Sequence, residues 1–134
     1  MENLPFSIPA VLAAALVNFA IGGLWYSPLA FSRAWMDAAG LDEARLRQAP
    51  MGRVFALAFA AALVMALNLA AFIGRGAGLA FAVSAGLAAG LGWAAMSLAV
   101  LYLFERRSLR LWLINAGYLV LAFGAMGAVL GALQ

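Results

Sequence analysis

Four long runs of uncharged, apolar residues set the strongest constraint on how this chain can fold. They cover residues 8–25, 54–73, 79–104 and 111–133. A helix rises about 1.5 Å per residue, so roughly 20 residues cross the ~30 Å hydrocarbon core of a bilayer. A charge at the centre of such a helix costs about 2.5–3.5 kcal/mol on the insertion scale, and none of the runs carries one. The pattern predicts four transmembrane helices.

The composition fits a chain whose surface faces lipid. The chain is 68% hydrophobic and 10% charged, whereas soluble domains are about 45–50% apolar and about 25% charged. A soluble fold of 134 residues with this composition would have too little polar surface to cover itself. We therefore expect one all-α membrane domain over residues 1–134, in contact with the lipid bilayer. The start, Met1-Glu2-Asn3, lacks the positive region of a secretory signal, so we expect the first helix to be retained.

The arginines predict the orientation. Seven of the eight lie between the first and second runs or between the third and fourth, and only Arg75 lies in the turn after the second run. Loops rich in arginine stay in the cytoplasm. We therefore expect a multi-pass protein of a bacterial inner (plasma) membrane, with both termini outside the cytoplasm.

The segment between the first and second runs shows helical spacing of its own. Apolar residues recur at Phe31, Ala34, Trp35 and Ala38. This spacing predicts a short amphipathic helix lying in the membrane interface. Gly40 is suited to end that helix, and Asp42 to begin a second short one. The alternative is a plain solvated linker.

Glycines four residues apart mark two of the predicted spans. Gly86 and Gly90 form such a pair in the third, and Gly127 and Gly131 in the fourth. Small residues at this spacing let two helix backbones approach closely in lipid. The spacing predicts close helix packing, but it fits a partner helix in the same chain or in another copy equally well.

Uncharged polar residues inside the runs are the candidate functional residues. Counting from the helix ends places four of them at one depth near the cytoplasmic side: Asn18, Ser97, Asn115 and Tyr118. Trp25 and Trp93 would form aromatic walls around this cluster. On the other side, Asn68 and Ser84 lie equally deep beside the turn that joins the second and third runs, so we expect them to meet.

Two interpretations of the cluster remain open. It could line a binding site or a narrow pathway, or its amides and hydroxyls could pair between helices and hold them together. The second interpretation needs no ligand. An aromatic belt at the membrane boundary likewise explains a further group of residues without a ligand: Trp25, Tyr26, Trp35, Tyr102 and Trp112.

The residue types that are missing exclude several classes of chemistry. The chain has no cysteine, no histidine and no lysine. We therefore expect no metal site, no cofactor and no disulfide. No acid lies inside a predicted span, so a catalytic base or nucleophile is lacking and we expect no enzyme activity. The arginines adjoin apolar runs rather than forming a soluble basic face, so we also expect no nucleic-acid partner.

Two motifs resemble those of a known family. The first is Asn18 followed by Gly22-Gly23-Leu24-Trp25-Tyr26-Ser27-Pro28, and the second joins Phe104-Glu105-Arg106-Arg107 to Ile114-Asn115-Ala116-Gly117-Tyr118. Together they resemble a bacterial membrane family catalogued as domain of unknown function 1761. The resemblance covers nearly the whole chain. It implies a four-helix membrane protein and no particular activity.

Two functions fit these observations. The first is a small channel or transporter with an uncharged pore, acting as a homo-oligomer. The lack of any embedded carboxylate argues against proton coupling of the kind used by small multidrug exporters. The second is a non-catalytic accessory or scaffold subunit that packs against other subunits of a larger membrane complex. The sequence does not separate the two.

Overall fold

The computed structural model describes residues 3–134, and within them all regular secondary structure is helical. The predicted all-α fold with four membrane-length helices is confirmed. The four spans are α1 (Ile8–Trp25), α4 (Met51–Ile73), the continuous stretch Leu79–Glu105, and α7 (Leu109–Leu133). Each is long and apolar enough to cross a membrane.

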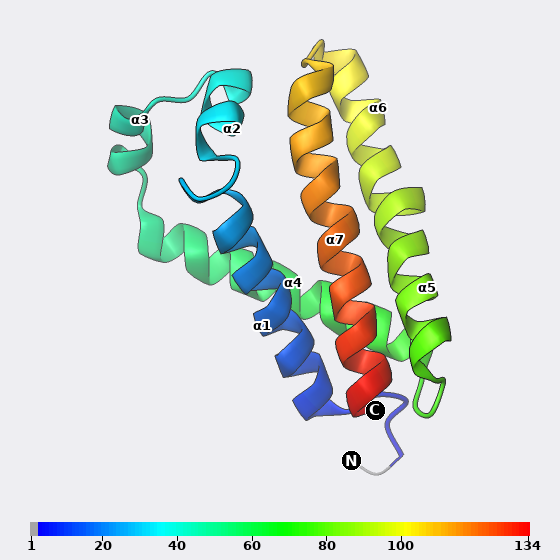
Figure 1. Ribbon diagram of the computed structural model, residues 1–134. Coiled ribbons are helices and arrows are strands. Elements are labelled where there is room, and N and C mark those ends of the chain that lie inside the picture. The colour runs from blue at the N-terminus through cyan, green and yellow to red at the C-terminus, as the bar shows by residue number, and fades with distance from the viewer. Residues whose placement is uncertain (1–2) are drawn as a thin grey trace.

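Helix α7 lies at the centre of the arrangement. It packs against α1 on one side and against α5 (Leu79–Ala89) and η1 (Gly90–Ala95) on the other, while α4 packs mainly on α1. In Figure 1, α1, α7 and the α5–α6 stretch run side by side, and α4 passes obliquely behind them. Helix α6 covers Met96–Glu105.

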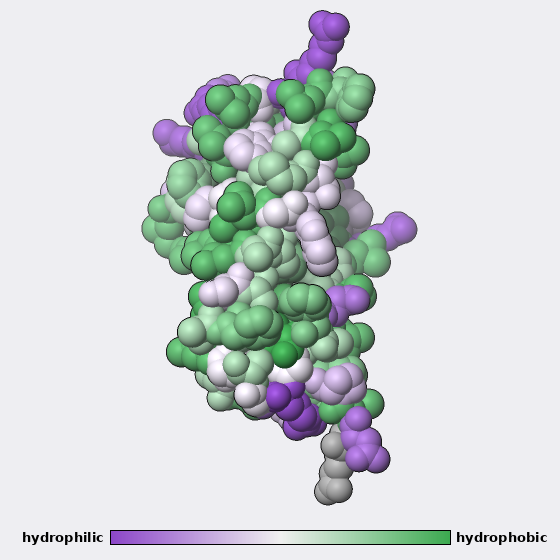
Figure 2. Space-filling view, turned by 90° about the vertical axis from the view of Figure 1, so that its right-hand side faces the viewer, coloured by the Kyte–Doolittle hydropathy of each residue, from purple (hydrophilic) through white to green (hydrophobic). Residues whose placement is uncertain are grey.

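The molecule has two distinct ends. One end, here called the arginine-rich end, carries α2, α3 and the turn between α6 and α7; the other, the glycine-turn end, carries the α4–α5 turn and both ends of the chain (Figure 1). Figure 2 shows a mainly apolar surface between hydrophilic residues at the two ends. This distribution suits a chain that crosses a bilayer along its long axis.

The core is built from small side chains where α1, α4 and α7 meet. Ala14 of α1 and Ala66 of α4 are fully buried, and Met126 of α7 is buried between them. Alanines keep the helix backbones close, and the flexible methionine fills the remaining space.

Both glycine pairs lie in the contact between α5 and α7, and each pair packs on the backbone of the other helix. A Cβ added at Gly86 of α5 would overlap the backbone carbonyl of Phe123 in α7, and one added at Gly127 would overlap the carbonyl of Ala82 in α5. Gly90 and Gly131 are almost as tightly covered. The structure therefore answers the question that the spacing left open, because the partner helix of each pair is in the same chain.

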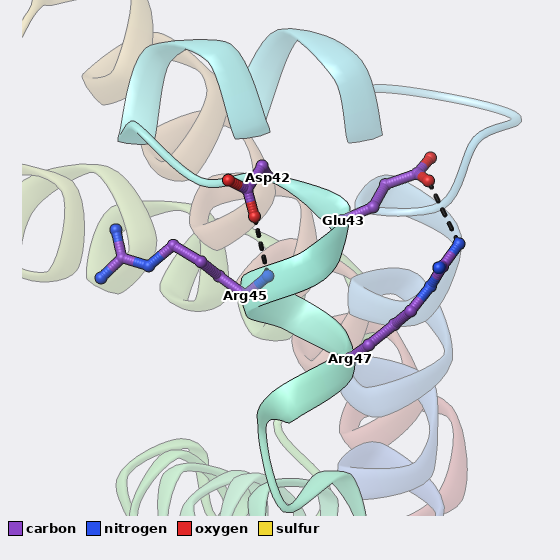
Figure 3. Close-up of polar contacts among 4 residues, drawn as sticks. All are labelled: Asp42, Glu43, Arg45 and Arg47. Atoms are coloured by element: carbon purple, nitrogen blue, oxygen red, sulfur yellow. Dashed lines mark hydrogen bonds and ion pairs between the residues drawn. The ribbon is translucent and has the colours of Figure 1, made fainter.

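The segment after α1 forms the two short helices that the sequence predicts. Helix α2 covers Ser32–Ala39 and ends at Gly40, whose φ of 72° is accessible mainly to glycine. Helix α3 covers Glu43–Gln48, and the side chain of Asp42 caps it by accepting a 2.7 Å hydrogen bond from the backbone N–H of Arg45. An exposed ion pair between Glu43 and Arg47 lies along its side (Figure 3).

Helix α2 is attached to α7 by one contact and to the end of α1 by another. Asp37 pairs with Arg110 of α7 at 2.8 Å. The ring of Trp35 lies edge-on to that of Tyr26, with their centroids 5.1 Å apart. These contacts hold α2 at the arginine-rich end, beside the C-terminus of α1.

A π-helical turn interrupts the third span. Gly90–Ala95 has this wider winding and separates α5 from α6. The indole N–H of Trp112 donates a 2.9 Å hydrogen bond to the backbone carbonyl of Ala95 at the end of the turn. Because a π-turn inserts an extra residue into the helix, it rotates all later side chains relative to those of α5.

Two polar side chains at the glycine-turn end donate hydrogen bonds to backbone carbonyls of neighbouring segments. Arg75 donates hydrogen bonds to the carbonyls of Leu4 and Phe6, at 3.1 and 2.9 Å. The side-chain amide of Gln134 donates to the carbonyls of Ala70 and Gly74, both at 3.1 Å. Arg75, the one arginine at this end, therefore satisfies backbone groups of the N-terminal segment.

Candidate functional site

Asn18 lies at the centre of the polar residues that the structure brings together. Its side chain is 1% exposed, and its carbonyl oxygen accepts a hydrogen bond from the phenol of Tyr118 on α7. Its amide nitrogen faces two methionine sulfurs, at 3.6 Å from Met126 and 3.8 Å from Met65. Thioether sulfur is a weak acceptor, so the bond to Tyr118 is the main polar contact of this amide.

Asn115 joins two tyrosines at the arginine-rich end. Its side-chain oxygen accepts a 2.6 Å hydrogen bond from the phenol of Tyr26, and its nitrogen donates one of 2.6 Å to the phenol oxygen of Tyr102. The ring of Tyr26 also lies edge-on to Tyr118, with centroids 5.6 Å apart. We call these five residues the tyrosine–asparagine network: Asn18, Tyr26, Tyr102, Asn115 and Tyr118.

Two glycines leave room for aromatic rings, one for Tyr118 within the network and one for Trp25 beside it. A Cβ at Gly22 of α1 would lie 3.2 Å from the ring of Tyr118, and one at Gly117 of α7 would lie 3.0 Å from the ring of Trp25. Trp25 also donates a 2.9 Å hydrogen bond from its indole to the backbone carbonyl of Ile114. Trp25 thus forms a wall beside the network, at the junction of α1 and α7.

The network carries no charge. Burial raises the pKa of the Tyr26 phenol well above its usual value, and the nearby phenols of Tyr118 and Tyr102 raise it further. Tyr26 therefore stays a neutral hydrogen-bond donor at physiological pH. Amides and neutral phenols can join helices and orient one another, but they supply neither a strong base nor a nucleophile.

Two residues assigned to this cluster by depth lie elsewhere. Ser97 is exposed at the start of α6, and the described residues give it no hydrogen bond to the network. Trp93 is 73% exposed on η1. Counting residues gives a depth but not a direction around the helix, and the π-turn at Gly90–Ala95 changes that direction in the middle of the span.

The expected contact between Asn68 and Ser84 is not formed. Within the part of the chain that the structure describes, the amide of Asn68 donates a 2.8 Å hydrogen bond to the carbonyl of Val64 in its own helix, and both polar side chains are exposed. The reason is that the two helices diverge after their turn, since α4 packs on α1 whereas α5 packs on α7.

This divergence opens a groove between α4 and α5. The groove has a volume of 610 Å³. Its walls are almost entirely apolar, with Asn68 and Phe72 on α4, Ala88 on α5, Trp93 on η1 and Phe123 of α7 behind them. Asn68 and Trp93 thus line the same groove, whereas counting residues places them in different clusters.

Four residues that take part in the buried polar contacts were not predicted as members of the polar cluster. Tyr26 and Tyr102 were assigned to an aromatic belt, and Met65 and Met126 were not considered. The signal for the tyrosines was available, because a phenol at a helix end needs a hydrogen-bond partner when it is buried. The methionines gave no such signal.

Comparison with known proteins identifies a family for this chain. Among curated proteins and among solved structures, none matches the chain. Residues 9–131 match a family described as "Protein of unknown function (DUF1761)". This match spans all four membrane-length helices, and it includes every residue of the tyrosine–asparagine network and every residue lining the groove. The chain therefore belongs to the DUF1761 family.

Proposed function

We propose that this protein is a non-catalytic accessory or scaffold subunit that packs against other membrane proteins. The observation that carries the proposal is the first half of α4. Every residue from Met51 to Ala58 is exposed, whereas the second half of the same helix is buried against α1 and α7 at Ala62, Ala66 and Ala70. A transmembrane helix of another protein can pack against this uncovered half.

The bonding of the polar residues supports a structural role. Within residues 3–134, every buried side-chain nitrogen and oxygen has a hydrogen-bond partner. Asn18 and Tyr118 are bonded to each other, and Asn115 is bonded on both sides by tyrosines. Polar groups that satisfy one another stabilise helix packing in lipid without a ligand.

Affinity purification from native membranes tests the proposal. We expect the tagged protein to recover a fixed set of other membrane proteins. Replacing Ala56 on the uncovered half of α4 with tryptophan should remove that set. The matched control is Ala20→Trp, at an exposed alanine of α1, and it should leave the recovery unchanged. Recovery of the wild-type chain alone, or the same recovery from Ala56→Trp as from Ala20→Trp, would contradict the accessory role.

The exposed hydroxyls favour a second candidate, a small channel or transporter that acts as a homo-oligomer. Ser84 and Ser97 lie on faces of the third span that no other helix of the chain covers. In an oligomer such faces could line an uncharged pore between copies. Solute flux into vesicles that contain only the purified protein, and its loss in a Ser84→Leu variant, would support this function over the first.

A further inference from the structure

The groove between α4 and α5 has the dimensions of a small-ligand site. Its volume of 610 Å³ lies within the roughly 300–1,000 Å³ range of ligand pockets. Its wall on the third span runs from Ala85 to Trp93, eight residues apart, which is about 12 Å along a helix. This length is close to the ~15 Å depth of one leaflet. It covers little more than two helical turns, so the groove is too short to hold a spanning helix along its length.

An amide side chain, that of Asn68, lines the groove on the α4 wall between Met65 and Phe72. Asn68 lies five residues before the end of α4 at Ile73, so it is within about 8 Å of the glycine-turn end along the helix axis. Trp93 is at the fifteenth position of the 27-residue stretch Leu79–Glu105, at its middle. The amide therefore lies nearer the membrane surface than Trp93, which lies at the centre of the third span.

Asn68, which lines the groove, keeps unused hydrogen-bonding capacity. One N–H of its amide is used by the 2.8 Å bond to the carbonyl of Val64. The amide has a second N–H and a carbonyl oxygen. Hydrocarbon offers no partner for these groups, and leaving them unpaired costs free energy. An ester carbonyl at this depth would accept the second N–H.

We propose that the groove binds one acyl chain of a membrane glycerolipid from the leaflet at the glycine-turn end. The ester carbonyl of the chain accepts a hydrogen bond from the Asn68 amide. The methylene groups beyond it pass Ala88 and Ala89 and end against Trp93 and Phe123, all of which line the groove. The lipid fills the space that α4 and α5 leave open as they diverge.

Photo-crosslinking tests this binding. The probe is a phosphatidylethanolamine with a diazirine in one acyl chain, in vesicles of phosphatidylethanolamine and phosphatidylglycerol that contain the purified protein. We expect the label on the groove wall between Ala85 and Trp93. Ala88→Phe, which fills the groove, should remove this label. The matched control Ala80→Phe lies on the same helix at an exposed alanine outside the groove and should leave it unchanged.

A second comparison isolates the hydrogen bond. One such bond is worth about 0.5–1.5 kcal/mol, so Asn68→Leu should reduce retention of the ester lipid by about two- to tenfold. An ether analogue of the probe lacks the carbonyl, and its retention should be the same in wild type and in Asn68→Leu. Equal labelling of Ala88→Phe and Ala80→Phe, or label spread evenly over all lipid-facing helices, would overturn the proposal. A disulfide that forms spontaneously between two Ala88→Cys chains would also overturn the proposal, because it would show that a second copy of the chain occupies the groove.

Discussion

The side chains of Asn18 and Tyr118 depend on each other because both lie between helices. Tyr118→Phe leaves the buried oxygen of Asn18 without its donor, so we expect it to lower the free energy of unfolding by about 1–3 kcal/mol. Asn18→Leu should cost a similar amount. The double variant should cost less than the sum, by about 0.6–1.7 kcal/mol. Unfolding in mixed micelles measures these values, with the exposed Ser97→Ala as control; strict additivity would contradict the bond.

Tyr26 makes stability depend on alkaline pH. Its pKa in the folded protein is raised, mainly by burial, whereas a tyrosine in the unfolded chain titrates near 10. A raised pKa means that the folded state holds the proton more tightly, so this stabilisation is complete below about pH 10 and is lost as the pH rises further. Tyr26→Phe should therefore reduce the fall in stability above about pH 10. At neutral pH it should weaken the fold, because Asn115 loses the hydrogen bond from the phenol. A fall of the same size in both proteins would show that Tyr26 is not its source.

The position of a polar residue along its helix could be predicted from the sequence. The direction in which its side chain points around the helix axis could not. Depth counting placed Asn18, Tyr118 and Asn115 at neighbouring levels, and in the structure these residues all belong to one network. The same counting included Ser97, which is exposed. The π-turn that redirects the third span contains Gly90 and Gly92 and packs against α7, and glycines in an apolar run do not by themselves predict a π-turn.

Among the helices, the contact between α5 and α7 is set by glycines that admit no side chain. In Gly86→Ala the added methyl group would overlap the backbone carbonyl of Phe123. Only a movement of a helix backbone relieves this overlap, because the neighbouring atoms do not belong to a flexible side chain. We expect a loss of about 1–3 kcal/mol or more in the free energy of unfolding. Gly23→Ala is the matched control, since its Cβ would meet nothing within 4 Å. Thermal unfolding in detergent measures both; equal effects would show that the two helices are not in close contact there.

The ends of the elements were more predictable than their directions. Gly40 ends α2 and Asp42 begins α3 as expected, because capping depends on a few neighbouring residues. The oblique path of α4 was not foreseen (Figure 1). Its path follows from packing against α1 through Ala62 and Ala66, and hydropathy along one helix holds no information about the partner helix or the crossing angle.

For the whole molecule, the separation of charge between its ends leads us to propose an orientation. The arginine-rich end should lie in the cytoplasm, and the glycine-turn end and both termini outside it. The chain has no native cysteine, so single cysteines report accessibility without a background. Ala77→Cys in the α4–α5 turn should react with an impermeant thiol reagent added to intact cells, whereas Ala44→Cys in α3 should react only after the membrane is permeabilised. Ala44 labelled in intact cells would reverse the orientation, and both sites labelled equally would mean that the chain inserts in two directions.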